Sequence, residues 1–281
     1  IFIMRKQYIS PAVKVFFLFA VIQFVLTVPA DAQVFRPVYG WDNDVNARLE
    51  AFLNSTITIG QRKVAVFDCD GTLFGQVPYY LADEALYDHA KKHYAGKEDA
   101  LSLKKMTIID RLAKEDNTSM QYVQDRIDFL SGMSVEEVER MGMDCFHAKY
   151  RQKFYPQMRT LLGDLQSYGF EIWVVSASPE LLYQDFVHEQ LGIAPDHIIG
   201  VRSVVHSDTV TNTMILPVPQ NGGKADAIQT FIKTRPLFAA GNSRGDMEMM
   251  NESVGLKMII NPDDTKTEKG SQAGAMDGYT V

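Results

Sequence analysis

The sequence has few cysteines and no surplus of basic residues, and both shortages narrow what the protein can be. Its two cysteines, Cys69 and Cys145, allow at most one disulfide bridge. Because Cys69 stands between two aspartates, we expect it to be a small buried side chain rather than half of a bridge. The formal net charge of −7 gives no electrostatic basis for binding nucleic acid or an anionic membrane. A hydrophobic content of 46% is that of an ordinary globular protein.

Long hydrophobic runs are also absent, apart from one near the N-terminus. That run, residues 15–28, is 14 residues long, shorter than the about 20 residues that cross a membrane as a helix. Basic residues precede it and Ala-Asp-Ala follows at 30–32, a pattern typical of a secretory signal peptide. We therefore expect a signal peptide at residues 1–32, a mature chain from about Gln33 with no membrane span, and export to the periplasm or the extracellular space. Its removal takes away three basic residues and one acidic residue, which leaves 25 and 34 and a net charge of −9.

The stretch at residues 63–74 carries the strongest functional pattern in the sequence. Residues 64–67 form a short apolar run rich in β-branched side chains, typical of a strand buried on both faces of a parallel sheet. Asp68 and Asp70 follow directly, and Gly-Thr then marks a turn. Ligands of open α/β sheets bind beyond the carboxyl ends of the strands, where a cation would relieve the repulsion between two such anions. A calcium loop is the competing interpretation, but its twelfth position is Tyr79 rather than glutamate.

The rest of the chain alternates strands and helices, except for one long helical block. Helices are predicted at residues 42–54, 81–94, 100–114, 118–130, 135–154, 158–168, 179–191, 222–233 and 247–251, and strands at 63–68, 170–175, 198–205, 213–218, 237–240 and 256–260. Since the helical block comes just after the first strand, we expect a cap over the site at residues 79–155 and a core formed by residues 33–78 and 156–281. The predicted fold class is α/β, with a Rossmann-like three-layer core around a mainly parallel sheet and an all-helical cap inserted after the first strand.

Polar residues recur where the predicted strands end. Ser176 follows the second buried strand, and Lys224 lies at the start of a helix. Asn242 and Asp246 follow the third buried strand. Taken singly, each has an ordinary explanation as a helix cap, a surface lysine or a turn residue. Their occurrence at successive strand ends, together with the two aspartates, predicts a single site.

The order of these groups resembles the haloacid dehalogenase superfamily. The resemblance rests on Asp-x-Asp-Gly-Thr at 68–72, the strand-end Ser176, Lys224, and Gly-Asn-Ser-x-x-Asp at 241–246. The helical block resembles the first type of cap in that superfamily, as in its phosphoserine phosphatase branch. Residues 198–205, with Pro-Val-Pro at 217–219 before Gly223-Lys224, resemble secreted phosphorylcholine phosphatases. One position departs from the pattern, because the last motif usually begins Gly-Asp and here contains Asn242. An amide oxygen still binds Mg²⁺ but brings no charge, which predicts weaker metal affinity.

The resemblance implies magnesium-dependent hydrolysis of a small phosphomonoester. Asp68 would attack phosphorus and carry an aspartyl-phosphate, while Asp70 would protonate the leaving oxygen and later take a proton from water. Thr72 would orient Asp70. The phosphoryl oxygens would be bound by Ser176, Lys224 and the backbone N–H groups near Cys69 and Ala177. The expected ligands of Mg²⁺ are the side chains of Asp68, Asn242 and Asp246 and the carbonyl of Asp70.

Two alternatives to a phosphatase stay open at this point: a phosphotransferase with the same site, and a phosphate-binding scaffold that has lost turnover. The second aspartate argues against a dehalogenase, which does not need that acid, and against an ion-pump domain, which has lysine after its first aspartate. The substrate is open as well. Phosphocholine or another phosphorylated amino alcohol would suit an aromatic cage and nearby carboxylates, for which the candidates are Trp41, Tyr79, Tyr80, Asp83 and Glu84. Packing at an interface is the competing interpretation of the aromatic residues.

Overall fold

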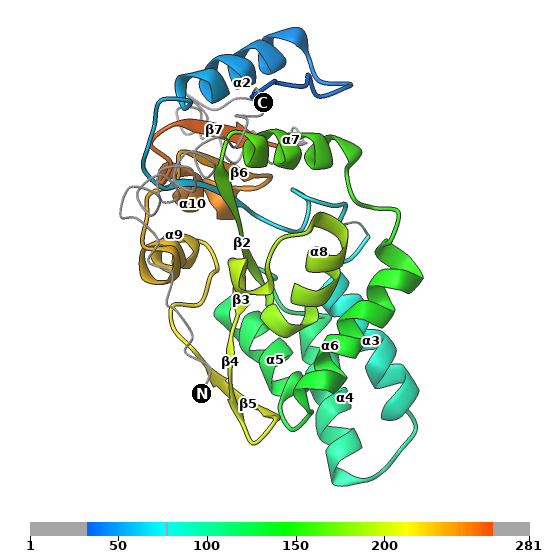
Figure 1. Cartoon of the computed structure of the whole chain (residues 1–281). Coiled ribbons are helices and arrows are strands. Elements are labelled where there is room, and N and C mark those ends of the chain that lie inside the picture. Colours follow the sequence, from blue (N-terminus) through cyan, green and yellow to red (C-terminus); the bar gives the residue numbers. More distant parts are fainter. Residues whose placement is uncertain (1–32, 77, 261–281) are drawn as a thin grey trace, which may run out of the picture. The chain divides into compact units, whose positions relative to one another are not determined.

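The protein is built on a parallel sheet, seen in a computed structural model that describes residues 33–76 and 78–260. Within these residues five strands pair in the order β3-β2-β1-β6-β7 (Figure 1). The strands of this sheet are β1 (Lys63–Phe67), β2 (Phe170–Pro179), β3 (Ile198–Val201), β6 (Phe238–Gly241) and β7 (Leu256–Ile259). At its centre Ala65 of β1 is level with Ile172 of β2 and Phe238 of β6. The predicted fold class is confirmed.

Helices surround the sheet and also fill the segment between β1 and β2. The α-helices of the described residues are α2 (Asn43–Ser55), α3 (Leu81–His93), α4 (Ala100–Leu112), α5 (Met120–Leu130), α6 (Val135–Cys145), α7 (Pro156–Ser167), α8 (Gln184–Leu191), α9 (Gly223–Ala227) and α10 (Met247–Asn251). The N-terminal residues 1–32, where we expect a signal peptide, lie outside the described part of the chain. Among the described helices, none combines the length and apolar character that a membrane crossing requires.

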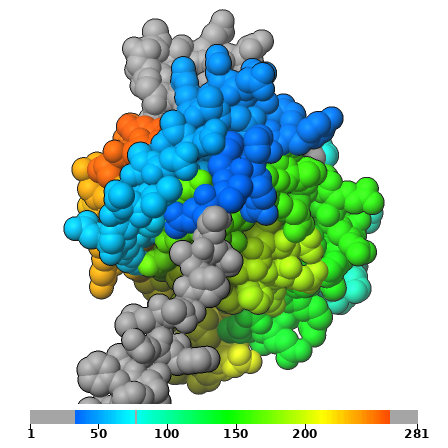
Figure 2. Space-filling model, turned by 45° about the horizontal axis from the view of Figure 1, so that its top comes forward, coloured from blue at the N-terminus to red at the C-terminus, as the bar shows by residue number. Residues whose placement is uncertain are grey.

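β1 is central because apolar side chains cover both of its faces. Val64 and Val66 point to one face, Ala65 and Phe67 point to the other, and all four are fully buried. The valine face packs against α9 and α10, and the other face packs against α2, α7 and α8. Figure 2 shows the blue segment that contains α2 on the surface of the molecule. Burying each of the two valine side chains and the phenylalanine stabilises the fold by about 1.5–3 kcal/mol, which explains why a run without alternation forms this strand.

The four helices α3, α4, α5 and α6 lie together, apart from the layers around β1 (Figure 1). α3 packs on α6, and α4 packs on α5. The hydroxyl oxygens of Ser119 and Ser134 begin α5 and α6 by accepting hydrogen bonds from backbone N–H groups three residues further on. A helical insertion after β1 is therefore present in the described chain, while the cap boundaries at residues 79 and 155 stay a prediction.

A two-stranded hairpin joins this insertion to the core. β4 (Ser203–His206) and β5 (Thr209–Met214) pair antiparallel, and Val210 exchanges 2.9 Å backbone hydrogen bonds with Gly132 and Met133, between α5 and α6. The strands predicted at 198–205 and 213–218 have the wrong limits. The first divides into β3 and β4, and β5 begins earlier because a largely polar run is held by pairing rather than by burial.

β2 extends beyond its predicted end at residue 175, and this changes the role of Ser178. The strand continues to Pro179, which pairs with Val201 of β3. A helix capped by Ser178 was expected here and is not found, because α8 begins only at Gln184 after a short 3₁₀ turn, Glu180–Leu182. Pairing with a neighbouring strand is a tertiary contact, and it overrides the local capping signal.

The helix predicted at residues 135–154 also ends early. α6 stops at Cys145 and continues as a wider π-helical turn, Phe146–Tyr150. Phe146 stacks there on Phe186 of α8, with ring centroids 4.9 Å apart. Both cysteines are free and buried, so the expected burial of Cys69 as a single small side chain is confirmed.

Candidate active site

The two predicted catalytic aspartates lie on a tight turn directly after β1. The N–H group of Gly71 donates to the carbonyl of Phe74 at 2.7 Å and closes this turn. Gly71 has a φ of +83°, and a Cβ atom there would lie 2.0 Å from Nδ2 of Asn242, so only glycine fits. The turn holds Asp68 and Asp70 over the end of the sheet with 5% and 7% of their surface exposed.

Asp68 is held by a cation and a hydroxyl. Nζ of Lys224 donates to Oδ1 at 2.6 Å, and Oγ1 of Thr72 donates to Oδ2 at 2.9 Å. Thr72 was expected to orient Asp70, and this expectation is wrong because the Gly71 turn directs its hydroxyl back to the first aspartate. Burial and repulsion from Asp246 raise the pKa of Asp68 to about 7, although Lys224 opposes both effects.

Lys224 bridges two carboxylates, since Nζ also donates to Oδ1 of Asp246 at 2.7 Å. Burial disfavours the charge of this lysine, but the carboxylates of Asp246 and Asp68 outweigh burial and raise its pKa above the ordinary value. The lysine is therefore charged at neutral pH, and one positive charge is shared by two negative ones. The expected placement of Lys224 at the site is correct in the structure.

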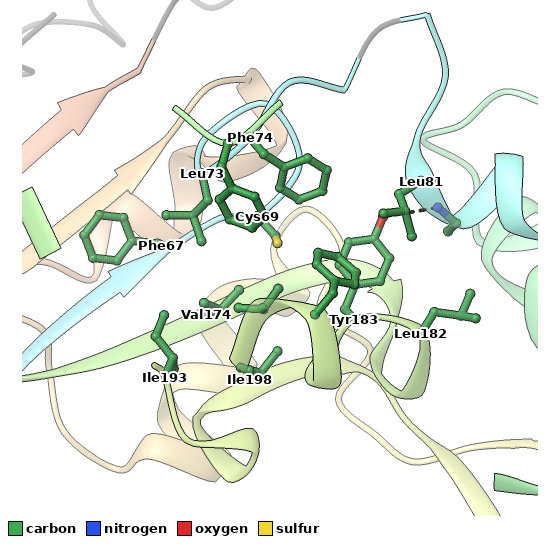
Figure 3. Close-up of a cluster of buried hydrophobic side chains, with 14 of the residues drawn as sticks. Phe67, Cys69, Leu73, Phe74, Leu81, Val174, Leu182, Tyr183, Ile193 and Ile198 are labelled. Atoms are coloured by element: carbon green, nitrogen blue, oxygen red, sulfur yellow. Dashed lines mark hydrogen bonds between the residues drawn. The ribbon is translucent and has the colours of Figure 1, made fainter. Parts of the chain in front are cut away.

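Asp70 is held by two neutral hydroxyl groups. Oγ of Ser178 donates to Oδ2 and the hydroxyl of Tyr183 donates to Oδ1, both at 2.9 Å. Burial raises the pKa of Asp70 to about 6, while these two hydrogen bonds limit the rise. The Tyr183 oxygen also accepts from the N–H of Ala82 at 3.3 Å, so the ring extends toward Leu81 at the start of α3 (Figure 3). Burial and the charge of Asp70 raise the pKa of Tyr183, which keeps it a donor.

Ser178 and Tyr183 are site residues that the sequence reading missed. Ser178 carried a signal, because it follows the strand-end Ser176 by two positions, but it was interpreted as a helix cap. Tyr183 carried none, because it stands inside a segment that has the pattern of a helix. Its contact with Asp70 spans 113 residues of sequence, so only the folded chain brings the two together.

The end of β2 brings Ser176 and Ala177 to the same edge, because Val174 of β2 is level with Phe67 of β1. Oγ of Ser176 accepts a 3.1 Å hydrogen bond from the N–H of Ser178, and the Ser176 side chain is buried. Ala177 is half-buried, so its backbone lies nearer the surface. Both residues predicted to bind phosphoryl oxygens therefore lie beside the aspartates.

The loop after β6 supplies the remaining predicted residues. Oδ2 of Asp246 accepts from the backbone N–H of Asn242 at 3.1 Å and from the N–H and Oγ of Ser243, each at 2.9 Å. Asp246 is 2% exposed and Asn242 is 5% exposed. The Asn242 amide lies against Gly71, so the last motif of the sequence contacts the first.

The oxygen atoms at this edge fit a hard divalent cation such as Mg²⁺. Asp68 and Asp246 lie close enough to share one lysine, and their repulsion is what a cation would reduce. The side chain of Asp70 is occupied by two hydroxyl donors, which leaves its main-chain carbonyl as the ligand expected from the sequence. Among the described residues, no three His, Cys, Asp or Glu side chains form a metal cluster by themselves. Amide and carbonyl oxygens with retained water suit Mg²⁺ better than zinc.

The carboxylates expected to suit a substrate amine are already paired. Asp83 accepts from Nε of Arg126 at 2.9 Å and from the hydroxyl of Tyr122. Glu84 forms an ion pair with Lys149. Both carboxylates therefore already pair with side chains of the chain itself, and their suitability for a substrate amine stays a prediction. The cause of this pairing is the packing of α3 against α5 and the turn after α6, which sequence spacing did not reveal.

The three aromatic residues considered for a cage do not form one. Tyr79 is 54% exposed, and Trp41 packs against the core beside α2. Tyr80 is the member near the aspartates: burial and the charges of Asp70 and Asp68 raise its pKa to about 12. A single aromatic ring at the site does not make a quaternary ammonium cage.

Comparisons with known proteins agree with this geometry. Residues 65–251, more than half of the chain, match the sequence profile of haloacid dehalogenase-like hydrolases, and the chain belongs to that family. This membership confirms the expectation of a hydrolase built on this fold. A comparison with curated protein sequences finds no significant match.

Solved structures of similar fold have low sequence identity to this chain. A protein of unknown function from Bordetella pertussis Tohama I has a TM-score of 0.62 at 16% identity, over 79% of this chain and 98% of that one. A conserved functionally unknown protein from Anaerococcus prevotii DSM 20548 has a TM-score of 0.61 at 13% identity, over 86% and 92%. A phosphoserine phosphatase solved as a phospho-aspartyl intermediate analogue has a TM-score of 0.47 at 20% identity, over 74% of this chain and 91% of that one.

Proposed function

We propose that this chain is a magnesium-dependent phosphatase that hydrolyses a small phosphomonoester through an aspartyl-phosphate on Asp68. The observation that carries the proposal is the contrast between two buried carboxylates on one turn. Asp68 is held by the charged Lys224, and Asp70 is held by the neutral hydroxyls of Ser178 and Tyr183. A nucleophile and a proton donor side by side need different environments. Without a metal the pKa of Asp68, about 7, lies above that of Asp70, about 6, so the charge of a bound Mg²⁺ would have to lower the pKa of Asp68 for the two roles to be met.

In the first step, an oxygen of Asp68 attacks phosphorus and the bond to the leaving oxygen breaks. Lys224 and Thr72 each hold one oxygen of Asp68, so the carboxylate is already oriented for an in-line approach. Asp70 gives its proton to the leaving oxygen, and the alcohol departs neutral. With its pKa raised to about 6, Asp70 keeps that proton nearer neutral pH than an ordinary carboxyl group does.

In the second step, the ionised Asp70 takes a proton from water, and the water oxygen attacks phosphorus. The bond between phosphorus and Asp68 breaks, which releases inorganic phosphate and restores the carboxylate. Ser176 accepts a bond from the backbone, so its own hydroxyl proton is available for a phosphoryl oxygen. Lys224 uses two of its three N–H groups on the carboxylates and has a third for the phosphoryl group.

The residues that would hold Mg²⁺ are Asp68 and Asp246, with the Asn242 amide and the Asp70 carbonyl as neutral ligands. The bound ion would neutralise the negative charge that the nucleophile and the phosphate bring together. Since Asn242 adds no charge, we expect weaker metal binding than an aspartate would give there.

We further propose that α3–α6 act as a helical cap of the kind found in the phosphoserine phosphatase branch. Tyr183 supports this, because its hydroxyl contacts both Asp70 and the first turn of α3. A phosphotransferase would use the same residues and differ in the acceptor. A scaffold without turnover is less consistent with the site, because four donors hold the two aspartates in place.

The test is phosphate release by the chain from residue 33 onward, from phosphoserine, phosphoethanolamine, phosphocholine, pyrophosphate and an aryl phosphate. We expect Mg²⁺-dependent release that a chelator stops and that Asp68→Asn reduces by about 10⁴-fold or more. Folding of the variant is checked by circular dichroism. Release that survives Asp68→Asn would contradict the proposed nucleophile. Magnesium binding without release from any ester would favour the scaffold.

Export remains a proposal that rests on residues 1–32 alone. Expression of the full chain in a Gram-negative host, followed by fractionation and N-terminal sequencing, would test it. We expect a periplasmic product that begins near Gln33. A cytoplasmic product of full length would contradict the proposed signal peptide.

A further inference from the structure

Among the buried side-chain nitrogen and oxygen atoms of the described residues, one has no hydrogen-bond partner, namely Oε1 of Gln220. Folded proteins pair nearly all buried polar atoms, so an unpaired acceptor requires a specific explanation. Gln220 lies on the loop that leads into α9, four positions before Lys224. Its backbone carbonyl accepts from the N–H of Gly223 at 2.9 Å, which ties the loop to the start of that helix.

The side chain of Gln220 crosses from the core to the helical insertion. Its Nε2 donates to the backbone carbonyl of Asn117 at 3.3 Å, and Nδ2 of Asn117 donates to the Tyr80 hydroxyl at 3.4 Å. Tyr80 directly precedes α3, where the N–H of Ala82 donates to the same Tyr183 hydroxyl that holds Asp70. Two hydrogen bonds therefore link Gln220 to the segment of the insertion that contacts Tyr183, and Lys224, which holds Asp68, lies four positions further along the chain.

The orientation of the Gln220 amide is determined by its partner. A backbone carbonyl only accepts, so the nitrogen of the amide must face Asn117 and the oxygen must face away from it. The unpaired atom is a neutral oxygen acceptor. Its chemical complement is an O–H or N–H group, whereas a methylated ammonium or an alkyl group would leave it unpaired.

We propose that Gln220 determines specificity: its Oε1 accepts a hydrogen bond from a hydroxyl or ammonium donor on the leaving group of the phosphomonoester. This inference rests on the proposed phosphatase function and adds the class of leaving group. Phosphorylated amino alcohols with a free amine and polyol phosphates have such a donor. Phosphocholine has no such donor, so it should be a poorer substrate than phosphoethanolamine.

The test compares matched esters and reports ratios of kcat/KM. The pairs are phosphoethanolamine against ethyl phosphate and glycerol 1-phosphate against propyl phosphate, with phosphocholine as a third comparison for phosphoethanolamine. In the unmodified chain we expect the donor-bearing ester of at least one pair to be favoured by about 10-fold to 100-fold, because its partner leaves a buried acceptor unpaired. A preference within the first pair indicates an ammonium donor, and a preference within the second pair indicates a hydroxyl donor.

Three variants separate specificity from a purely structural role. Gln220→Met keeps the size of the side chain but removes the acceptor, and we expect the ratio to fall to near one. Gln220→Glu keeps an acceptor but loses the bond to Asn117, and we expect the preference to persist. Asn117→Ala, the matched control, loses the contact with Tyr80 but keeps the backbone carbonyl that Gln220 uses, and we expect an unchanged ratio.

The outcomes distinguish this inference from the function on which it rests. A residue that only joins the two segments would slow all esters equally when changed, so an unaltered ratio in Gln220→Met, with Asp68-dependent release intact, overturns the inference alone. Equal use of both members of each pair by the unmodified chain has the same consequence. Absence of Asp68-dependent release from every ester overturns both proposals. A folded Gln220→Met variant, verified by its melting temperature, is required for each comparison.

Discussion

The surroundings of Asp68 and those of Asp70 differ in the kind of group that holds each carboxylate. Asp68 shares Lys224 with Asp246, so two charged groups lie around it in addition to the hydroxyl of Thr72. Asp70 is held by Ser178 and Tyr183, which are neutral donors. Both aspartates are buried to nearly the same extent, and a single residue, Cys69, separates them.

This difference shows how two carboxyl groups on one turn can serve as a nucleophile and as a proton donor. A carboxylate beside a lysine remains an anion and a nucleophile once a metal offsets the repulsion from its acidic neighbour. Asp70 has hydroxyl groups rather than a cation in direct contact, and burial outweighs these hydrogen bonds and the more remote charges of Arg126 and Lys224, which leaves it able to carry a proton near pH 6. Four predictions test the contrast, from the largest expected effect to the smallest.

The loss of kcat on replacing the proton donor Asp70 should depend on the leaving group of the ester. We expect Asp70→Asn to lower kcat for ethyl phosphate by about 10²- to 10⁴-fold, and to lower it much less for 4-nitrophenyl phosphate. The reason is that a nitrophenolate departs without a proton, whereas an alkoxide does not. The measurement is kcat for both esters at saturating Mg²⁺, with Asp68→Asn as a control that should affect both equally. An equal loss of kcat with both esters in Asp70→Asn would contradict the role of Asp70 as proton donor.

Loss of one hydroxyl around Asp70 should move its pKa. The hydrogen bond from Tyr183 stabilises the ionised form and lowers the pKa, so Tyr183→Phe raises it. Since the protonated form acts first, kcat/KM falls as pH rises through this pKa, and we expect that limb to move to higher pH. The change should also cost about tenfold in kcat, because Asp70 is less firmly oriented.

The control for this variant is Tyr168→Phe, which removes a hydroxyl bonded to Asn54 in the α2 layer. We expect no movement of the pH profile there. Ser178→Ala removes the other donor to Asp70 and should move the limb in the same direction as Tyr183→Phe. If the fall of kcat/KM at high pH occurs at the same pH in both variants and in the unmodified chain, the pKa of Asp70 does not determine it.

A negative charge added near Asp68 should increase the affinity of the site for Mg²⁺. Asn242→Asp places a carboxylate beside Asp246, and we expect the Mg²⁺ concentration for half-maximal activity to fall about threefold to tenfold. The measurement is phosphate release against free Mg²⁺. Asn251→Asp, at the end of α10, adds the same charge away from this edge and should change little. An unchanged Mg²⁺ dependence in Asn242→Asp would place the metal elsewhere.

The stability of the metal-free protein should depend on pH in a defined direction. The pKa values of Asp68 and Asp70 rise from an ordinary 3.8 to about 7 and about 6. The folded chain therefore binds more protons than the unfolded chain between these values, and the free energy of unfolding falls as pH rises from about 4 to about 7.

We expect that decrease to be several kcal/mol, because each unit of raised pKa corresponds to about 1.4 kcal/mol and both carboxyl groups titrate in this range. Urea unfolding in a chelator at pH 5 and pH 8 measures it. Asp68→Asn should flatten the dependence, and Mg²⁺ at pH 8 should restore stability to the unmodified chain. A metal-free protein that becomes more stable from pH 5 to pH 8 would contradict the raised pKa values.

Much of the site was predictable because its residues lie at ends of strands. The apolar run before Asp68 predicts a buried strand, and Asp70, Ser176, Lys224 and Asp246 were all expected at one edge. The structure brings each of them there. These positions follow from local patterns, since a parallel sheet places every strand end on the same side.

The sequence reading failed where the contacts of a side chain depend on tertiary packing. Thr72 was assigned to the wrong aspartate because the Gly71 turn reverses its direction. Ser178 has a good capping sequence around it, yet strand pairing extends β2 past it. Asp83 pairs with Arg126 of α5, a contact that sequence spacing did not reveal.

The sequence by itself determined the sheet, the two aspartates and the family, because periodicity, strand ends and a glycine turn are properties of short segments. Tertiary structure decided which donor holds which carboxylate. Tyr183 reaches Asp70 from 113 positions away, and Gln220 meets Asn117 from 103 positions away. Such contacts depend on how the helical insertion packs over the sheet, and no local pattern encodes that packing. The pKa difference between Asp68 and Asp70 is therefore a property of the folded chain.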